Sequence, residues 1–142
     1  MILFDVNVLI NAHRAGQEHH DIARELVEHV VRGPEPFAVS ELVMSGFVRI
    51  VTNPRAFAVP TPLDEAFLFV SSIKDHPNAR VVRPGGRHWE IFEQLCRSTQ
   101  ARSALIADAH HAALAIEHGC EWLSFDRDFA KFSDLRWRHP LD

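Results

Sequence analysis

The sequence predicts an α/β fold of three layers, in which a short central parallel sheet lies between two layers of helices. Short apolar runs of strand length alternate along the chain with longer runs of helical periodicity. Several of the helical runs begin at a capping residue, end at glycine or end before proline. Such alternation is typical of βαβ units, and 142 residues with a hydrophobic fraction of 46% predict a single domain over residues 1–142.

The chain opens with the first strand pattern and its helix. Residues 1–4 form an apolar run that predicts a buried strand, and this run stops at Asp5. A helix is expected over residues 21–31, ending at Gly33. Its expected buried face consists of Ile22, Leu26 and Val30.

A second strand and two helices follow. Residues 37–39 predict a strand, and Ser40 is placed to cap a helix over residues 41–51. The next helix is expected from Thr61 toward Lys74, because a capping residue is followed there by proline at the first helical position and an acid in the first turn.

The remaining elements complete the alternation. Residues 80–83 predict a strand, followed by helices over residues 88–97 and 103–118, the second of which ends at Gly119. Residues 121–125 predict another strand, and residues 136–138 an edge strand.

Four carboxylates are candidates for one site. Asp5, Glu41 and Asp126 each follow a predicted strand closely. Parallel strands end at the same edge of a sheet, where α/β proteins place their ligands, so these acids are expected to meet. Asp108 interrupts the apolar stripe of the helix over residues 103–118 and needs a partner or a metal to offset its lost hydration.

Such a cluster requires a counter-charge. Two carboxylates about 4 Å apart repel by roughly 4 kcal/mol at an effective dielectric constant near 20. All the ligands are oxygens, which suits Mg²⁺ or Mn²⁺ better than zinc. Such a cation activates water and stabilises the charge that develops on a phosphodiester, so the acids predict a metal-dependent phosphodiesterase.

Several motifs resemble the PIN-domain family and, within it, the mycobacterial-type branch of the VapC toxins of bacterial toxin-antitoxin pairs. The opening MILFDVNVLI (residues 1–10) resembles the family's D-x-N-x-L-I. The matching segments, in chain order, are SELV (40–43), RIVTNP (49–54), DAHHAALAIEHG (108–119) and SFDRDF (124–129). The resemblance runs nearly from end to end.

The resemblance implies a Mg²⁺-dependent endoribonuclease, with Mn²⁺ as an alternative ion. Such an enzyme cuts structured RNA such as tRNA or rRNA, inhibits translation and is silenced by a cognate VapB-like antitoxin. A homodimer is also expected. Asp5 and Asp108 would be the principal metal ligands, completed by Glu41 and Asp126. One or two metals fit equally.

The residues around these ligands are assigned by the same resemblance. Supporting contacts are expected from Asn7, Ser40 and Ser124, and RNA contacts are considered for Arg49, Asn53 and Arg127. Val6 and Phe125 stand where many relatives have polar residues, which puts some supporting contacts in question. Asp128 is a rival to Asp126 and lies two residues further on.

Composition limits the partners. A formal net charge of −4 argues against binding nucleic acid through bulk positive charge. Thirteen of the fifteen basic residues are Arg, which binds phosphate in a bidentate manner. With no signal sequence and no apolar run of membrane-spanning length, we expect a cytoplasmic protein that does not bind membranes. Cys96 and Cys120 are expected to be reduced core thiols.

Two alternative functions compete with the nuclease. A haloacid-dehalogenase-type phosphatase also begins with a strand and Asp, but it needs a second Asp where this chain has Asn7. The other alternative is a non-catalytic module of the same shape that binds a partner protein. The ten histidines lack a zinc-site spacing and are expected at the surface. The apolar stripes with Phe47, Phe67, Phe69 and Phe92 are expected in the core.

Overall fold

The computed structural model describes residues 1–142 and contains one five-stranded sheet, with every neighbouring pair of strands parallel. The strands are β1 (Ile2–Phe4), β2 (Phe37–Val39), β3 (Ala79–Val81), β4 (Glu121–Leu123) and β5 (Trp137–Arg138). They lie in the order β3-β2-β1-β4-β5, so β1 occupies the centre. This confirms the predicted α/β class and each of the five predicted strands.

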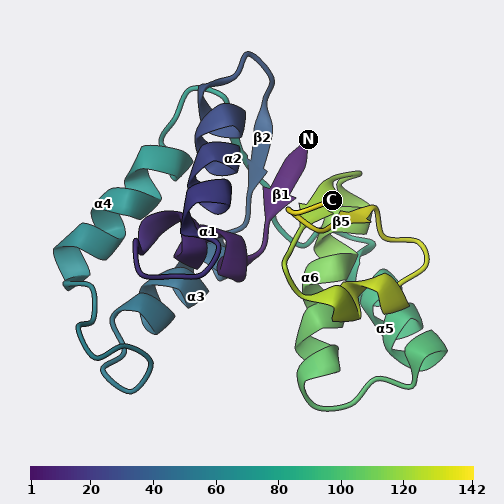
Figure 1. The fold of residues 1–142 in the computed structure, drawn as a ribbon. Coiled ribbons are helices and arrows are strands. Elements are labelled where there is room, and N and C mark those ends of the chain that lie inside the picture. Colours follow the sequence, from purple (N-terminus) through teal and green to yellow (C-terminus); the bar gives the residue numbers. More distant parts are fainter.

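Six α-helices connect and cover the strands (Figure 1). They are α1 (Val6–His13), α2 (His20–Arg32), α3 (Glu41–Val51), α4 (Leu63–Lys74), α5 (His88–Thr99) and α6 (Ala104–Glu117). A 3-10 helix, η1 (Arg127–Lys131), follows β4. None of these helices has the length and apolar character that crossing a membrane requires.

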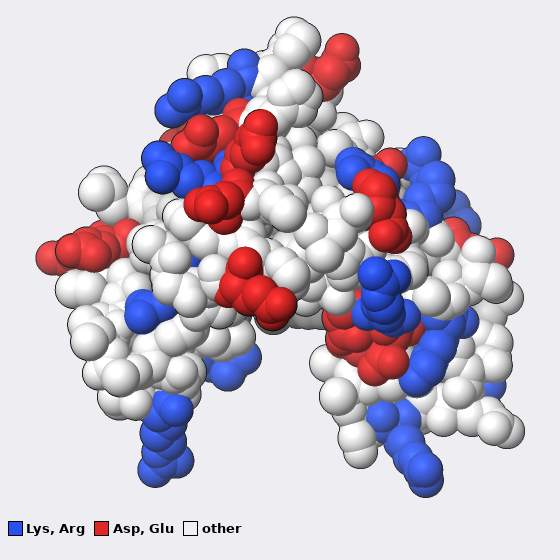
Figure 2. Space-filling view, viewed as in Figure 1, with Lys and Arg blue, Asp and Glu red and all other residues white.

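The helices form two groups on either side of the sheet (Figure 1). Helix α1 packs against α2 and α3, and α3 packs against α4, whereas α5 packs against α6. Right-handed crossovers explain the grouping, because the chain moves one way from β1 to β3 and then returns across the sheet to β4. A notch separates the ends of the two lobes, on the side where α3 and α6 face each other (Figures 1 and 2).

The core is formed by the strands and the inner faces of the helices. Its largest fully buried side chains include Trp122 on β4, Phe37 on β2 and Phe47 on α3. The free thiol of Cys120 is buried, and that of Cys96 is partly buried. No disulfide links them, as expected from the sequence.

Two details of the predicted core are wrong. On α2, Leu26 and Val30 are partly buried against the core as predicted, but Ile22 is 45% exposed. The fully buried residues are Ala23, Val27 and Val31. The small Ala23 is fully buried where α2 packs closely against α1. Phe67 is 53% exposed, since α4 turns Ala66, Val70 and Ile73 inward instead.

The structure also contains one helix that the sequence did not predict, and two histidines that were expected at the surface are buried. Helix α1 begins directly after β1, with Asp5 as its capping residue. His88 and His139 are buried, contrary to their expected surface position. A hydrogen bond between Nε2 of His88 and the carbonyl oxygen of His110, at 3.0 Å, offsets the hydration that the buried ring loses. Imidazole is apolar enough to bury once its nitrogens find partners.

Two phenylalanines test this description of the core. Phe47→Ala should lower the free energy of unfolding by about 3–5 kcal/mol, because Phe47 is fully buried and stacks on Phe69. Phe67→Ala, on the outer face of α4, should change it by less than about 0.5 kcal/mol. Urea denaturation measures both changes. Equal losses in the two variants would mean that α4 packs differently.

Candidate metal centre

The centre of the sheet brings the first and last acidic motifs together. Strands β1 and β4 are neighbours, and Phe4 is in register with Leu123. The next residues, Asp5 and Ser124, therefore leave the sheet side by side. Their side chains hydrogen-bond at 2.6 Å, with the Ser124 hydroxyl donating to Oδ2 of Asp5. This pairing explains how residues 119 positions apart in the sequence form one site.

Asp5 is held rigidly. Its side chain is among the few buried polar ones, with the residue only 7% exposed. Oδ1 accepts a hydrogen bond from the backbone N–H of Val6 at 2.7 Å and so caps α1. Burial raises the pKa of the Asp5 carboxyl to about 6, while the bonds from Ser124 and Val6 act in the opposite direction and Asp126 adds a smaller increase.

Asn7 and Ser124 connect Asp5 to the loop after β4. The Asn7 amide donates to the Ser124 hydroxyl oxygen at 3.1 Å and to Asp5 Oδ2 at 3.3 Å. Its oxygen accepts from the backbone N–H of Phe125 at 3.2 Å. Ser124 Oγ also accepts from the backbone N–H of Asp126 at 3.0 Å. This network orients both acids, which agrees with the supporting contacts predicted for Asn7 and Ser124.

Three further carboxylates form a cluster that can bind a cation. Asp108 on α6, Asp126 at the start of η1, and Asp128 within η1 each have an oxygen within 4.8 Å of the others. Asp126 and Asp128, which were rivals for one position in the sequence analysis, both belong to the cluster. Lys131 lies 3.3 Å from Asp128 and is the nearby positive charge. Figure 2 shows acidic side chains gathered beside the notch.

Like charges around Asp108 perturb its titration. The pKa of the Asp108 carboxyl is raised to about 6, mainly by partial burial and then, in decreasing order, by the carboxylates of Asp126, Asp5 and Asp128. Lys131 acts in the opposite direction. Asp5 therefore contributes to the same electrostatic field as the other three acids. An unneutralised cluster of this kind favours either bound protons or a bound cation.

These residues fit a hard divalent cation. Their donor atoms are all carboxylate oxygens, with no thiol or imidazole among the three. Oxygens that share one octahedral Mg²⁺ lie about 3–4 Å apart. The present separations of up to 4.8 Å need only a small inward movement of the side chains. Asp5, next to them, can act as a direct ligand or through water.

The structure does not bring Glu41 to this cluster. Its carboxylate lies 3.0 Å from Arg83 and 3.5 Å from Lys74. Lys74 ends the helix before β3 and Arg83 follows β3, so both partners lie on the β3 side of β1. The three acids lie on the β4 side of β1. Glu41 does follow a strand at the predicted edge, but its side chain turns away. The Ser40 hydroxyl caps α3, accepting from the Val43 N–H at 3.3 Å.

The three residues considered for RNA contact lie in different surroundings. Arg49 is exposed on α3, makes no ion pair and faces the notch. Asn53 forms a turn after α3, accepting from the Arg55 N–H at 2.9 Å. Arg127 is 3.9 Å from Asp142 near the end of the chain. Arg49 is therefore the one of these three residues that offers a cationic group without an ion-pair partner.

Sequence reasoning ranked Asp128 second and did not connect Lys131 with the acids. The spacing of Asp126 and Asp128 contains a usable signal, because a 3-10 turn places alternate acids near one another and Lys131 three residues further on. It also missed Gly46, which lies opposite Val6 in the notch. No local signal identifies that glycine.

The fold and the acids define the class of protein. Residues 2–135 match the PIN domain family model. The chain belongs to the PIN-domain family. Among curated relatives it is 46% identical over 142 residues to ribonuclease VapC43 of Mycobacterium tuberculosis, covering 100% of this chain and 97% of the relative. It is 39% identical over 140 residues to ribonuclease VapC25 of the same organism, covering 99% of each chain.

Solved structures have the same fold. VapBC2 from Rickettsia felis, bound to a promoter DNA fragment, matches with a TM-score of 0.70 at 12% identity and covers 98% of both chains. VapC20 of Mycobacterium tuberculosis, a sarcin-ricin loop cleaving toxin, matches with a TM-score of 0.67 at 17% identity, covering 92% of this chain and 93% of that one. The chain is thus an enzyme of the VapC ribonuclease type. The phosphatase and non-catalytic alternatives are set aside.

Charge repulsion at Asp108 has a measurable effect on stability. Because the fold raises the pKa of this carboxyl from 3.8 to about 6, the folded chain binds more protons than the unfolded chain between these values. This contribution to stability is present at low pH and is lost as the pH rises through 6. In EDTA at pH 8, Asp108→Asn should therefore be at least as stable as wild type, and this advantage should shrink toward pH 4.

Urea titrations at pH 8 and pH 4 measure the difference in the free energy of unfolding between Asp108→Asn and wild type. The histidines are the same in both proteins, so their contributions cancel in this difference. Glu41→Gln is the matched control. It removes an exposed, ion-paired carboxylate and should change the free energy of unfolding by less than about 1 kcal/mol. An Asp108→Asn variant clearly less stable than wild type at pH 8 would assign that side chain a structural role.

Proposed function

We propose that this protein is a Mg²⁺-dependent endoribonuclease toxin that cuts structured RNA, tRNA or rRNA, and thereby inhibits translation in the cytoplasm. The observation that carries the proposal is the cluster of Asp108, Asp126 and Asp128 beside the buried Asp5. The perturbed pKa values of Asp5 and Asp108 support it, because they mark acids whose charge has not been neutralised by the protein itself.

Each acid has a distinct task in this proposal. Asp108, Asp126 and Asp128 hold the cation, and Asp5 completes the negative field from the centre of the sheet. Asn7 and Ser124 keep Asp5 and the loop after β4 in a fixed orientation. When bound, Mg²⁺ supplies a nucleophilic water and stabilises charge on the phosphate. We leave Glu41 outside this set, because Arg83 and Lys74 engage it.

The choice of RNA follows from the class and the charge. The relatives are ribonucleases, and VapC20 cleaves the sarcin-ricin loop. Net charge of −4 gives little non-specific attraction for long RNA. A compact, structured RNA that presents one cleavable segment matches such a surface better than bulk transcripts. Arg49 beside the notch provides the unengaged cation for a phosphate.

The nuclease proposal makes a direct kinetic prediction. Asp108→Asn should reduce Mg²⁺-dependent cleavage of total tRNA and rRNA by at least about a hundredfold, because one mutation removes a ligand and the charge that attracts the cation. Asp128→Asn should also reduce it. Glu41→Gln should retain most of it, which makes it the control.

Sequencing of 5′-phosphate ends measures this cleavage, and calorimetry with Mn²⁺ measures metal binding. Undiminished cleavage by Asp108→Asn would refute the proposed centre. Loss of metal binding in Glu41→Gln, with the fold intact, would return Glu41 to the ligand set.

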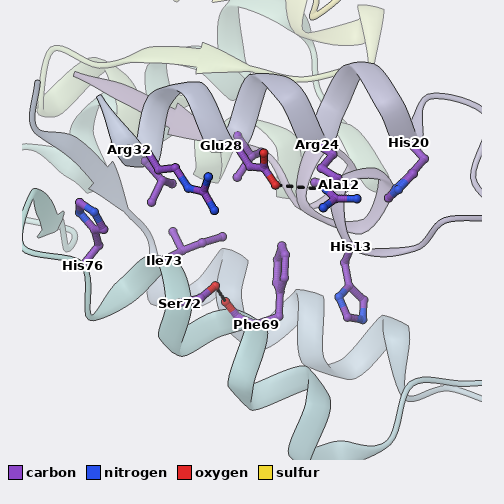
Figure 3. A pocket seen from close by; sticks show the side chains of 12 residues that line it. Ala12, His13, His20, Arg24, Glu28, Arg32, Phe69, Ser72, Ile73 and His76 are labelled. Atoms are coloured by element: carbon purple, nitrogen blue, oxygen red, sulfur yellow. Dashed lines mark hydrogen bonds and ion pairs between the residues drawn. The ribbon is translucent and has the colours of Figure 1, made fainter. Parts of the chain in front are cut away.

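A VapB-like antitoxin is the proposed partner, because several of the matching solved structures are toxin-antitoxin complexes. A hollow of about 500 Å³ between α2 and α4 is the surface we assign to it (Figure 3). Its floor is apolar, with Val27, Val31, Phe69 and Ile73. Its rim carries Arg24 and Arg32 and three histidines, against one acid, Glu28. An acidic amphipathic segment of the antitoxin suits this chemistry.

Charge reversal at this rim tests the partner surface. Arg32→Glu should weaken binding of the antitoxin encoded beside this gene by at least about tenfold, because it places an acid opposite an acidic segment. Arg55→Glu, a reversal of an exposed charge away from the hollow, should leave the affinity unchanged. Isothermal calorimetry measures both. Equal affinities for the two variants would assign the antitoxin to another surface.

A homodimer is also part of the proposal. The outer face of α4 exposes Leu63, Phe67 and Leu68, which are 58%, 53% and 73% exposed. Adjacent large apolar side chains of this kind favour contact with another protein surface. A second copy of the chain is the occupant that we propose for this face.

A further inference from the structure

The side chain of Phe125 contacts two imidazole rings beside the proposed metal centre. Phe125 directly precedes Asp126 and is partly buried. His19 stacks on its ring, with the two centroids 4.7 Å apart and the planes inclined by 11°. His139 meets the same ring nearly at a right angle, with the centroids 5.3 Å apart. Two segments that are distant in the sequence thus hold the residue next to a proposed metal ligand.

His139 is a firm support for the Phe125 ring. It is 5% exposed, and its Nδ1 accepts a hydrogen bond from the backbone N–H of Leu141 at 3.1 Å. A ring nitrogen that accepts a hydrogen bond carries no proton, so this imidazole is neutral. The indole N–H of Trp137, on β5, donates to the carbonyl oxygen of Ser124 at 3.1 Å. The end of the chain therefore supports both Ser124 and Phe125 in the loop after β4.

His19 reaches Phe125 from the connection between α1 and α2. Its side chain is 29% exposed, and its one ion-pair partner is Glu18, at 3.8 Å. The side chain of Glu18 is 86% exposed, so this pair contributes little to holding the imidazole in place. The stack on Phe125 is the contact that fixes the orientation of the His19 ring.

Hydrogen bonds connect His19 back to the metal centre and close a ring of four residues. The backbone N–H of His19 donates to Oδ1 of Asn11 at 3.3 Å, and Nδ2 of Asn11 donates to the backbone carbonyl oxygen of Asn7 at 2.8 Å. Oδ1 of Asn7 accepts from the Phe125 N–H, and the Phe125 ring returns to His19. Asn7 also orients Asp5. In a closed ring, no member can shift without breaking a contact.

Repulsion among the acids makes this support necessary. Asp126 shares the acidic cluster with Asp108 and Asp128, and without a cation these like charges push the loop after β4 outward. Asp126 can move away only if its neighbour Phe125 moves as well. The stack with His19 opposes this movement. The acids therefore stay close enough to share one cation.

We propose that His19 is a positioning residue of the nuclease, which holds Asp126 in place for the cation through its stack on Phe125. This inference rests on the proposed function and adds a residue to its site. His19 supplies no ligand to the acidic cluster, so its effect passes through Phe125. The role requires a flat ring and no proton transfer, so another aromatic side chain at position 19 can fulfil it.

Two substitutions at His19 separate packing from proton transfer. His19→Ala removes the stack and should weaken Mn²⁺ binding at pH 8 by about fivefold, within the range expected for one aromatic pair. His19→Phe keeps a ring without titratable nitrogens and should bind Mn²⁺ within about twofold of wild type. His29→Ala removes an exposed imidazole from the last turn of α2 and is the control, with no change expected. Calorimetry measures all three affinities.

A double-mutant cycle tests the route through Phe125. Phe125→Leu keeps an apolar side chain but removes the aromatic ring, and it should weaken Mn²⁺ binding at least as much as His19→Ala because the contact with His139 is lost too. Addition of His19→Ala to Phe125→Leu should cause no further loss, since both remove the same contact. Losses that multiply would overturn the inference.

Other results would also contradict it. Equal weakening of Mn²⁺ binding by His19→Phe and His19→Ala would show that the imidazole itself is needed. A lower melting temperature of His19→Ala with unchanged Mn²⁺ affinity would assign His19 a structural role only.

Hydrogen exchange separates this inference from the proposed function, because it needs no metal. In EDTA, His19→Ala should speed exchange of the Phe125 and Asp126 backbone N–H groups by about fivefold and leave those of α3 unchanged, since only the local opening changes. An equal increase in α3 would mean a global loss of stability and would overturn the inference. Wild type that binds no Mn²⁺ would refute the metal centre, while the local increase would still support positioning by His19. Mn²⁺ binding by wild type, with exchange and affinity unchanged in His19→Ala, would remove the role of His19 and leave the nuclease intact.

Discussion

Mutual repulsion among carboxylates at the centre of the sheet is the constraint on which the site depends. Asp5 is buried at the end of β1, and the charge of Asp126 adds to the effect of burial in raising its pKa. Asp126, Asp5 and Asp128 likewise add to the effect of burial in raising the pKa of Asp108. A protein can hold such charges together only by tying each to a rigid support. Here the supports are the helix cap at Val6 and the Asn7–Ser124 network. The repulsion that remains is the driving force for binding a cation.

The arrangement of the helices decides what can approach this cation. Because α1 to α4 lie on one side of the sheet and α5 and α6 on the other, a notch separates the two lobes, and acidic side chains gather beside it (Figures 1 and 2). One wall carries Arg49 and the other carries the acids. A phosphodiester in the notch would therefore lie between the unpaired guanidinium of Arg49 and the acidic cluster. An overall charge of −4 is compatible with RNA chemistry because attraction is needed only at this position.

Much of the fold was predictable because hydrophobic periodicity and capping are local signals. The bounds of β2 and α3 agree with the prediction at both ends. Helix α1 was missed because Val6 to Ile10 is nearly all apolar, so no periodicity distinguishes it from a continued strand. On α2, Ile22 was assigned to the buried face in place of Ala23 because Ala23 gives a weaker apolar signal, although close packing against α1 favours the smaller side chain.

The sequence alone determined the strand-helix alternation, the family motifs, the position of Asp5 and Asp126 just after strands, and the position of Asp108 on an apolar helical stripe. Only the tertiary structure decided which acids meet. Glu41 and Asp5 both follow strands at one edge, yet Glu41 turns toward Arg83 and Lys74 on the β3 side, while Asp128 joins the cluster through the turn of η1. The physical reason is that spacing along the chain specifies where a Cα lies on a sheet edge, whereas the direction of a side chain depends on the charges and hydrogen-bond partners that distant segments place around it.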